Sequence, residues 1–223
     1  MKMDMGALNM IAGWVSNGDT IMIEQMPIYG GYCGGVEETA ICDVAATIAS
    51  FVLFNCDLHL DGPIHIRWGS TTTRETLQIA AHAACAVDAN TNLLLGNQYY
   101  TLAGPCTEMC LLETAAQAVT DTVSGRELVS GSAACKGVVK DKTTGMEARM
   151  LSEAATAAVG MEVGETNKML NNVISIYEKE FPHPPTGKRF QDCYDMKEVV
   201  PSNEYLKVYD RALATLRKCG LDL

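Results

Sequence analysis

The sequence lacks the features of a membrane protein or a nucleic-acid-binding protein. No apolar run approaches the roughly 18 residues that span a bilayer, and no signal-peptide pattern opens the chain. Basic residues are scarce at first: residues 1–125 hold 3 basic and 13 acidic residues, whereas residues 126–223 hold 14 of each. Because no basic stripe exists, we expect no nucleic-acid partner. Because a membrane-spanning run and a signal peptide are missing, we expect no membrane association and place the protein in the cytoplasm.

Paired metal ligands are also missing. The nine cysteines form an odd set, and the C-x3-C pair Cys106 and Cys110 has no second pair at metal-binding spacing. We therefore expect reduced, mostly buried thiols and no metal. His59, Asp61 and His65 offer an alternative metal site, but His65 falls inside an expected apolar strand, which favours a hydrogen-bonded core histidine.

The chain does contain a repeated strand–helix rhythm. Short apolar runs at 19–25, 62–69, 91–100 and 126–134 are followed by helical patterns at 37–56, 73–90, 105–125 and 145–160. Strands of this kind, each followed by a helix, are typical of parallel βαβ units in an α/β fold. From Gly164 onward the pattern changes to amphipathic helices joined by a polar, proline-rich link.

Four such units are half of what a closed barrel needs. A complete (β/α)8 barrel has eight strands and about 250 residues, whereas this chain has four units and opens with a helix-like segment. The four units could form a small open sheet or half of a barrel. We divide the chain into residues 1–160, the βα part, and residues 161–223, a helical extension packed on it.

Polar side chains gather where the expected strands end, which is where parallel α/β folds bind ligands. Glu24 ends the first strand, Arg67 and Trp68 the second, residues 97–100 the third, and residues 130–132 the fourth. Glu24 follows an apolar strand and precedes the glycine loop "YGGYCGG", so partial desolvation would raise its pKa and suit it to proton transfer. A plainer alternative is an ion pair between Glu24 and Arg67.

The loop after Glu24 holds Gly30, Gly31, Gly34 and Gly35. Glycines permit positive φ angles and a close approach of the backbone, so this loop could be a mobile lid or one side of the site. Their spacing matches no phosphate-binding motif. Lys136, near the end of the fourth strand, could also reach the site. We name Glu24, Gln98 and Tyr100 as candidate catalytic residues, with Arg67 and Tyr99 as candidate substrate-binding residues.

Several long motifs together resemble the monomethylamine methyltransferases, which contain pyrrolysine. The motifs are "EQMPIYGGYCGGVEET", "LDGPIHIRWGSTTTRET", "GNQYY", "AGPCTEMCLLE", "KGVVKDKTTGMEARM" and "YDMKEVVPSNEYLKVYD". The resemblance implies a TIM barrel enzyme that moves the methyl group of monomethylamine to the cobalt of a partner corrinoid protein. It also implies that Glu24 in "EQMP", and Gln98 and Tyr100 in "NQYY", stand around pyrrolysine.

The resemblance further implies a chain about twice this length. We expect this sequence to be the C-terminal half of such an enzyme, begun at Met1 downstream of the amber codon for pyrrolysine, and inactive alone. The family is assembled from several copies, so we expect a homo-oligomer at full length. Two alternatives stay open: a non-catalytic half-barrel that binds a partner half or itself, and a small α/β enzyme of another class using Arg67 and Glu24.

Overall fold

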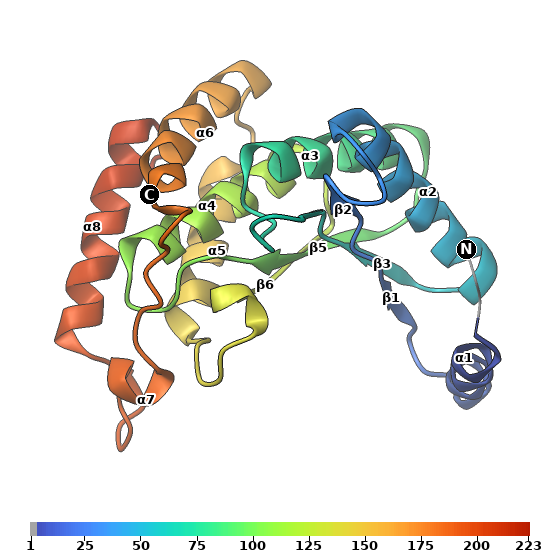
Figure 1. The fold of residues 1–223 in the computed structure, drawn as a ribbon, viewed down its shortest axis with the longest axis horizontal. Coiled ribbons are helices and arrows are strands. Elements are labelled where there is room, and N and C mark those ends of the chain that lie inside the picture. Colours follow the sequence, from blue (N-terminus) through green and yellow to red (C-terminus); the bar gives the residue numbers. More distant parts are fainter. Residues whose placement is uncertain (1–3) are drawn as a thin grey trace.

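A parallel sheet of four strands forms the centre of the computed structural model, which describes residues 4–223 (Figure 1). The strands are β1 (Met22–Glu24), β3 (Leu58–Asp61), β5 (Leu95–Tyr100) and β6 (Leu128–Ala133), and they lie in that order. Neighbouring strands therefore follow one another along the chain, and every pair is parallel. An order without a reversal is that of a barrel wall rather than a doubly wound sheet.

Each strand is followed by a helix: α2 (Val36–Phe54), α3 (Arg74–Asn90), α4 (Glu108–Val123) and α5 (Gly145–Ala158). Threonine side chains fix where three of them begin, because Thr73, Thr107 and Thr144 each accept a backbone N–H of the first turn. The sheet face opposite the helices is open: Met22 of β1 is 52% exposed and Leu128 of β6 is 39% exposed. These are side chains that would face the interior of a closed barrel.

The second strand is the strand of the main sheet that the sequence analysis misplaced. We expected it at 62–69, but the strand of the main sheet is β3, and 62–69 forms a loop beyond it. Within that loop β4 (Ile64–His65) pairs with β2 (Ile28–Tyr29). Periodicity missed β3 because two of its four residues, His59 and Asp61, are polar yet fully buried.

A buried ionic network explains those polar residues. Arg126 lies 2.7 Å from a carboxylate oxygen of Asp61 and 3.0 Å from one of Asp121 on α4. The Asn97 amide donates to Asp121 at 2.9 Å. Asp43 of α2 faces Asp61 in the same network, where burial raises its pKa well above the ordinary range. The network joins strands and helices on the covered face of the sheet, so it leaves the open face free.

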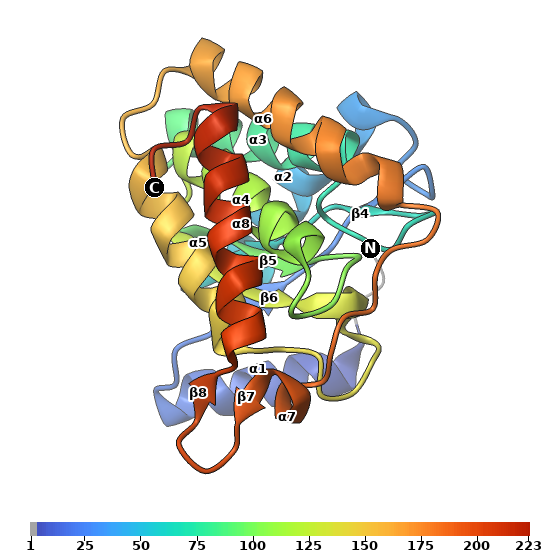
Figure 2. The same ribbon diagram turned by 90° about the vertical axis from the view of Figure 1, so that its left-hand side faces the viewer.

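The chain ends in helices of which the first and the last pack against α4. They are α6 (Val163–Tyr177), α7 (Phe190–Cys193) and α8 (Asn203–Cys219), with a hairpin of β7 (Tyr194–Asp195) and β8 (Val200–Pro201) before α8 (Figure 2). Met169 of α6 and Leu216 of α8 join the core cluster that α4 and α5 also form. The α1 helix (Met5–Asn17) precedes β1 at the other end of the molecule (Figure 1). No helix within residues 4–223 is both long and apolar enough to cross a bilayer.

Candidate active site

Three of the predicted site residues meet on the open face of the sheet. Glu24 is paired in register with Leu60, and Leu60 with Gly96. Residues paired in register point to the same face, and side chains two residues apart on a strand do so too. Gln98 therefore lies one step beyond Gly96 on the face that Glu24 occupies, at the carboxyl end of the strands.

Hydrogen bonds join Glu24, Gln98 and Tyr100 into a chain. With its nitrogen turned to the carboxylate, the Gln98 amide donates to Glu24 Oε1 at 2.8 Å and to Oε2 at 3.2 Å. In the same orientation its Oε1 accepts the Tyr100 hydroxyl at 3.2 Å. The opposite orientation would set the amide oxygen against a carboxylate, so the donating one is favoured.

The surroundings shift the titration of both ionisable members. Burial raises the pKa of Glu24, and burial together with the negative charge of Glu24 raises the pKa of Tyr100. A carboxylate whose pKa is raised toward neutrality is a better proton acceptor and donor near pH 7. The arrangement can therefore bind a small cation at Glu24, orient it through Gln98 and Tyr100, and accept a proton from it.

The end of β5 is held by a loop that the sequence analysis did not single out. The Tyr100 N–H donates to the Thr71 hydroxyl at 3.0 Å, and the Tyr100 carbonyl accepts the Ser70 hydroxyl at 2.8 Å. The β5–β6 register also shifts between Asn97 and Tyr99, as bulges beside functional sites do. The run "GSTTT" ahead of α3 carried this signal, because consecutive buried hydroxyls need partners.

Close backbone packing adds to this support. A Cβ atom at Gly62 would lie 2.8 Å from the Gln98 carbonyl oxygen, so only glycine allows β5 to approach here. In the loop after Glu24, Gly30 and Gly34 have φ values of 73° and 87°, and the Gly30 N–H donates to the Gly34 carbonyl at 2.9 Å. The glycines thus form a tight turn beside the site.

Arg67 and Tyr99 are not brought to the three-residue cluster. Arg67 is exposed in the loop beyond β3, where its guanidinium lies 4.4 Å from the centre of the Trp68 ring. Among the described residues no ion pair joins it to Glu24. Tyr99 is fully buried on the helix side of β5, close to Asp121. Two reasons explain these placements: β3 ends before Arg67, and alternation along β5 turns Tyr99 away from Gln98.

The histidines and Lys136 take positions that differ in part from expectation. His59, not His65, is the buried core histidine, and burial with nearby Arg126 lowers its pKa to about 4. His65 is half-buried in β4, against the Tyr29 ring at 5.0 Å. Lys136 approaches Gly69 at the edge of the same loop region. No cluster of metal ligands occurs within residues 4–223.

Comparison with known proteins decides the family. The sequence model for the monomethylamine methyltransferase MtmB matches residues 1–221. The chain belongs to this family. MtmB of Methanosarcina mazei and MtmB1 of Methanosarcina acetivorans are each 57% identical to it over 221 residues, which are 99% of this chain and 48% of each relative. The chain therefore spans about half the length of the curated relatives it matches.

Solved MtmB structures have the same fold. The crystal structure of MtmB from Methanosarcina barkeri matches with a TM-score of 0.98 and 55% identity over 100% of this chain and 49% of that one. A crystal structure of a hydroxylamine MtmB complex matches with the same values. The resemblance to the C-terminal half of this family is confirmed, and so is the α/β fold of half a TIM barrel with four parallel βα units and terminal helices.

Proposed function

We propose that this chain carries half of the active site of a methyltransferase that moves the methyl group of monomethylamine to the cobalt of a corrinoid protein. The single observation that carries the proposal is the hydrogen-bonded cluster of Glu24, Gln98 and Tyr100, at the strand ends of a chain that belongs to the MtmB family. The curated relatives are named for monomethylamine.

Each member of the cluster has a role suited to a small amine. Glu24 attracts the methylammonium cation and accepts its proton, which frees the nitrogen lone pair. Gln98 donates to the Glu24 carboxylate and keeps it directed at the open face, while Tyr100 accepts or donates at the amine. Hydroxylamine, which is named in one MtmB complex, is likewise a small nitrogen nucleophile.

The remaining parts of the reaction lie outside this chain. The resemblance implies that pyrrolysine, an electrophilic imine that captures the amine, belongs to the half of the family's chain that has no counterpart here. The corrinoid is carried by a separate protein, and transfer requires carbon, nitrogen and cobalt to align at the barrel mouth. We infer that the chain alone binds no cofactor and does not turn over. We also infer that the full-length protein is a cytoplasmic homo-oligomer.

A chimeric barrel tests this function. This chain would be joined to the preceding half of MtmB from Methanosarcina mazei, in a host that inserts pyrrolysine at amber codons. Methyl transfer from monomethylamine to the corrinoid protein is then measured for the chimera and for variants. We expect activity in the chimera, and a loss of roughly a hundredfold or more in Glu24→Gln, because a general base is removed. Gln98→Leu is expected to lose activity as well.

The matched control is Gln78→Leu, the same change on an exposed position of α3. It should keep the activity of the chimera. A folded chimera without activity would show that this chain is a non-catalytic half-barrel. Activity that survives Glu24→Gln would contradict the role of Glu24 as the proton acceptor. Transfer that persists with the chain alone would contradict the division of the site between two halves.

A further inference from the structure

Strand β5 loses its neighbouring strand on one side before it reaches Tyr100. The neighbour, β3, ends at Asp61, which is paired with Asn97 of β5. Beyond this point, hydroxyl groups of the "GSTTT" run bond to the backbone of β5. The Tyr100 N–H donates to Thr71 Oγ1 at 3.0 Å, and the Tyr100 carbonyl accepts the Ser70 hydroxyl at 2.8 Å. The placement of Tyr100 therefore depends on what holds these two hydroxyl groups.

The N–H side of Tyr100 is held through Thr71 by Gln117 of α4. The Thr71 hydroxyl donates to Gln117 Oε1 at 2.5 Å, and its oxygen accepts the Tyr100 N–H. The hydroxyl supplies the hydrogen for one of these contacts and the backbone amide supplies the hydrogen for the other. This chain of hydrogen bonds is therefore complete with every group in its ordinary protonation state.

The carbonyl side of Tyr100 is held through Ser70 and Thr72 by Glu113, one helical turn before Gln117. Ser70 Oγ lies 2.8 Å from the Tyr100 carbonyl oxygen and 2.6 Å from Thr72 Oγ1. Thr72 Oγ1 in turn lies 2.6 Å from Glu113 Oε1. Oxygens at these distances need a hydrogen between them. The serine and threonine hydroxyls supply only two hydrogens for these three contacts.

A carboxylate at Glu113 leaves one contact of this chain without a hydrogen. As a carboxylate, Glu113 accepts the Thr72 hydroxyl, and the Tyr100 carbonyl accepts the Ser70 hydroxyl. The Ser70 and Thr72 oxygens then face each other at 2.6 Å with lone pairs only. A proton on Glu113 completes the chain, because the carboxyl group then donates to Thr72, Thr72 donates to Ser70, and Ser70 still donates to the carbonyl.

The surroundings of Glu113 support a proton on it. Glu113 is fully buried, and burial raises its pKa to about 7, although two backbone N–H groups donate to it. The titratable groups that face it are Cys110 of α4, Cys135 beyond β6 and Tyr177 of α6, and burial raises the pKa of each of them. Glu147 of α5 acts on Cys110 instead.

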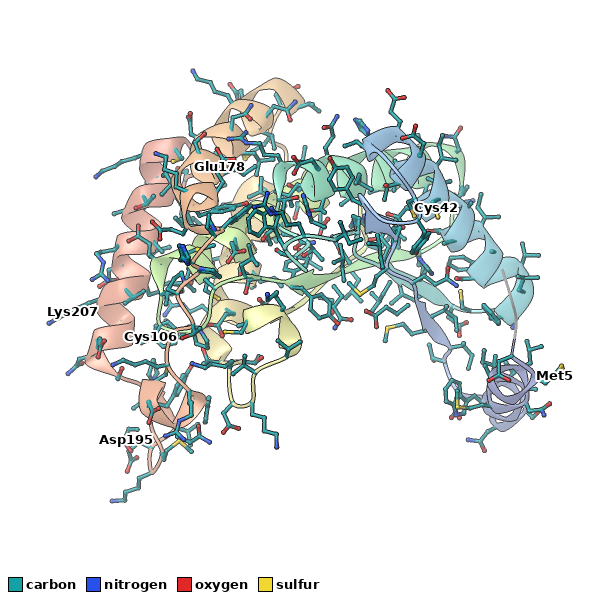
Figure 3. All side chains as sticks on the ribbon, in the orientation of Figure 1. Met5, Cys42, Cys106, Glu178, Asp195 and Lys207 are labelled. Atoms are coloured by element: carbon teal, nitrogen blue, oxygen red, sulfur yellow. The ribbon has the colours of Figure 1, made fainter. Side chains whose placement is uncertain are left out.

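No basic side chain within residues 4–223 offsets the burial of Glu113. Arg74, at the start of α3, is paired with Glu178, which follows α6 directly and is labelled in Figure 3. The two side chains lie 2.7 Å apart and are both partly exposed. Charged groups on α3, α5 and α8 therefore do not lower the pKa of Glu113.

The tyrosine ring passes the placement of the Tyr100 backbone on to its hydroxyl. A Cβ atom at Gly137 would lie 3.2 Å from Cε1 of the ring, so the ring has little room to turn. Its hydroxyl contacts the Gln98 amide of the site. A shift of the Tyr100 carbonyl therefore moves the hydroxyl relative to Gln98, and misplacement of about 1 Å at a reacting centre lowers rates strongly.

We propose that Glu113 is a positioning residue for methyl transfer, which in its protonated form holds Tyr100 in place through Thr72 and Ser70. Ionisation of Glu113 opens one contact of the chain and releases the carbonyl side of Tyr100. Ser70, Thr72 and Glu113 are fully buried within this chain, so the half of the family's length without a counterpart here does not reach them. This inference rests on the proposed function for its effect on methyl transfer, whereas the proton on Glu113 concerns this chain alone.

Infrared spectroscopy of the chain tests the protonation of Glu113 without any activity. The carbonyl stretch of a protonated carboxyl group, assigned to Glu113 by its loss in Glu113→Gln, should be present at about pH 6. It should fade as the pH rises through about 7. Absence of this band at about pH 6 in a folded chain would overturn the proposal.

Methyl transfer by the chimera of the two halves tests the positioning of Tyr100. Thr72→Val and Thr72→Ser are a matched pair, because only serine keeps the hydroxyl of the chain. We expect kcat to fall roughly tenfold or more in Thr72→Val and to stay within about threefold of wild type in Thr72→Ser. In Glu113→Gln the fall of kcat as the pH rises through about 7 should disappear, because an amide does not ionise.

Equal rates in the two Thr72 variants, or a fall with pH that persists in Glu113→Gln, would overturn the proposal. Circular dichroism confirms that the compared proteins are folded. A folded chimera that is inactive in every form would contradict the proposed function instead, and the infrared band then decides whether Glu113 holds its proton.

Discussion

At the scale of single residues, alternation along β5 separates two tasks. Asn97 and Tyr99 point toward the helices, where the Asn97 amide donates to Asp121 and the Tyr99 hydroxyl lies close to the same carboxylate, and Gln98 and Tyr100 point toward the open face. Each strand residue thus either anchors the strand or serves the site. Every polar side chain of this strand therefore has a polar neighbour, but only those of Gln98 and Tyr100 lie on the face where a substrate could bind.

The Gln98 amide stabilises the ionised form of Glu24 by donating to it. Replacing it in Gln98→Leu removes that donor and adds an apolar neighbour, so the pKa of Glu24 should rise above its wild-type value. Carbon-13 NMR of the side-chain carboxyl, assigned with Glu24→Gln, measures this. Gln78→Leu on α3 should leave the Glu24 titration in place. An unchanged or lower pKa in Gln98→Leu would show that the amide does not face the carboxylate.

At the scale of elements, α4 supports the strand end through one buried carboxylate. Glu113 accepts the Thr72 hydroxyl at 2.6 Å and the backbone N–H groups of Leu102 and Ala103 at 2.8 and 2.9 Å. Leu102 and Ala103 lie in the loop that follows β5, and Thr72 lies just ahead of α3. The helix therefore fixes the two loops that border the site, and it does so with a group whose burial raises its pKa to about 7.

This raised pKa makes the stability depend on pH. The ordinary pKa of a glutamate is 4.5, and folding raises that of Glu113 to about 7, so folding favours the protonated carboxyl group. The stabilisation from this group is fully present below pH 4.5 and is lost as the pH rises through about 7. The shift corresponds to roughly 3 kcal/mol, and the melting temperature should fall between pH 5 and pH 8. In Glu113→Gln the fall should be smaller, with a remainder from Asp121, whose pKa is raised to about 6.

The control for this titration is Glu37→Gln at the exposed start of α2, which should keep the wild-type slope. Melting temperatures followed by circular dichroism at half-unit pH intervals are sufficient. A melting temperature that rises with pH over this range would contradict the prediction, because it would mean that folding does not raise the pKa of Glu113.

At the scale of the whole molecule, the C-terminal helices belong to the same core as the βα units. Leu216 of α8 is fully buried, and the Tyr177 hydroxyl of α6 donates to the Thr72 carbonyl at 2.7 Å. We propose that residues 161–223 are an extension that cannot be separated from the half-barrel without exposing α4. The opposite edges of the sheet remain open, which is where the family's other half would continue it.

Two matched variants of α8 test this dependence. Leu216→Asp places a charge in the core and should destabilise the whole chain by about 3 kcal/mol or more, in a single transition. Leu206→Asp makes the same change on the exposed side of the helix and should shift the unfolding free energy by less than about 0.5 kcal/mol. Loss of only the α8 signal in Leu216→Asp, with the βα units still folded, would mean that the extension is independent.

The sequence was enough to predict most helices and three of the four main strands, because apolar periodicity and threonine caps are local signals. Strand ends and the resemblance also pointed to Glu24, Gln98 and Tyr100 as candidates, and the structure brings these three side chains together; their catalytic role stays a prediction. The sequence analysis misplaced β3 because His59 and Asp61 interrupt its apolar pattern. Nothing local to Asp61 indicates that Arg126, 65 residues further along the chain, forms a buried ion pair with it.

The local chemistry of the chain thus determined which elements form, in which order, and which side chains end them. Only the tertiary structure decided which strand ends meet. Strand pairing set the register that aligns Glu24 with Gln98, alternation sent Tyr99 into the core, and the length of β3 left Arg67 in a loop. The physical reason is that register and facing depend on contacts between residues far apart in sequence, where a shift of one residue reverses every side chain.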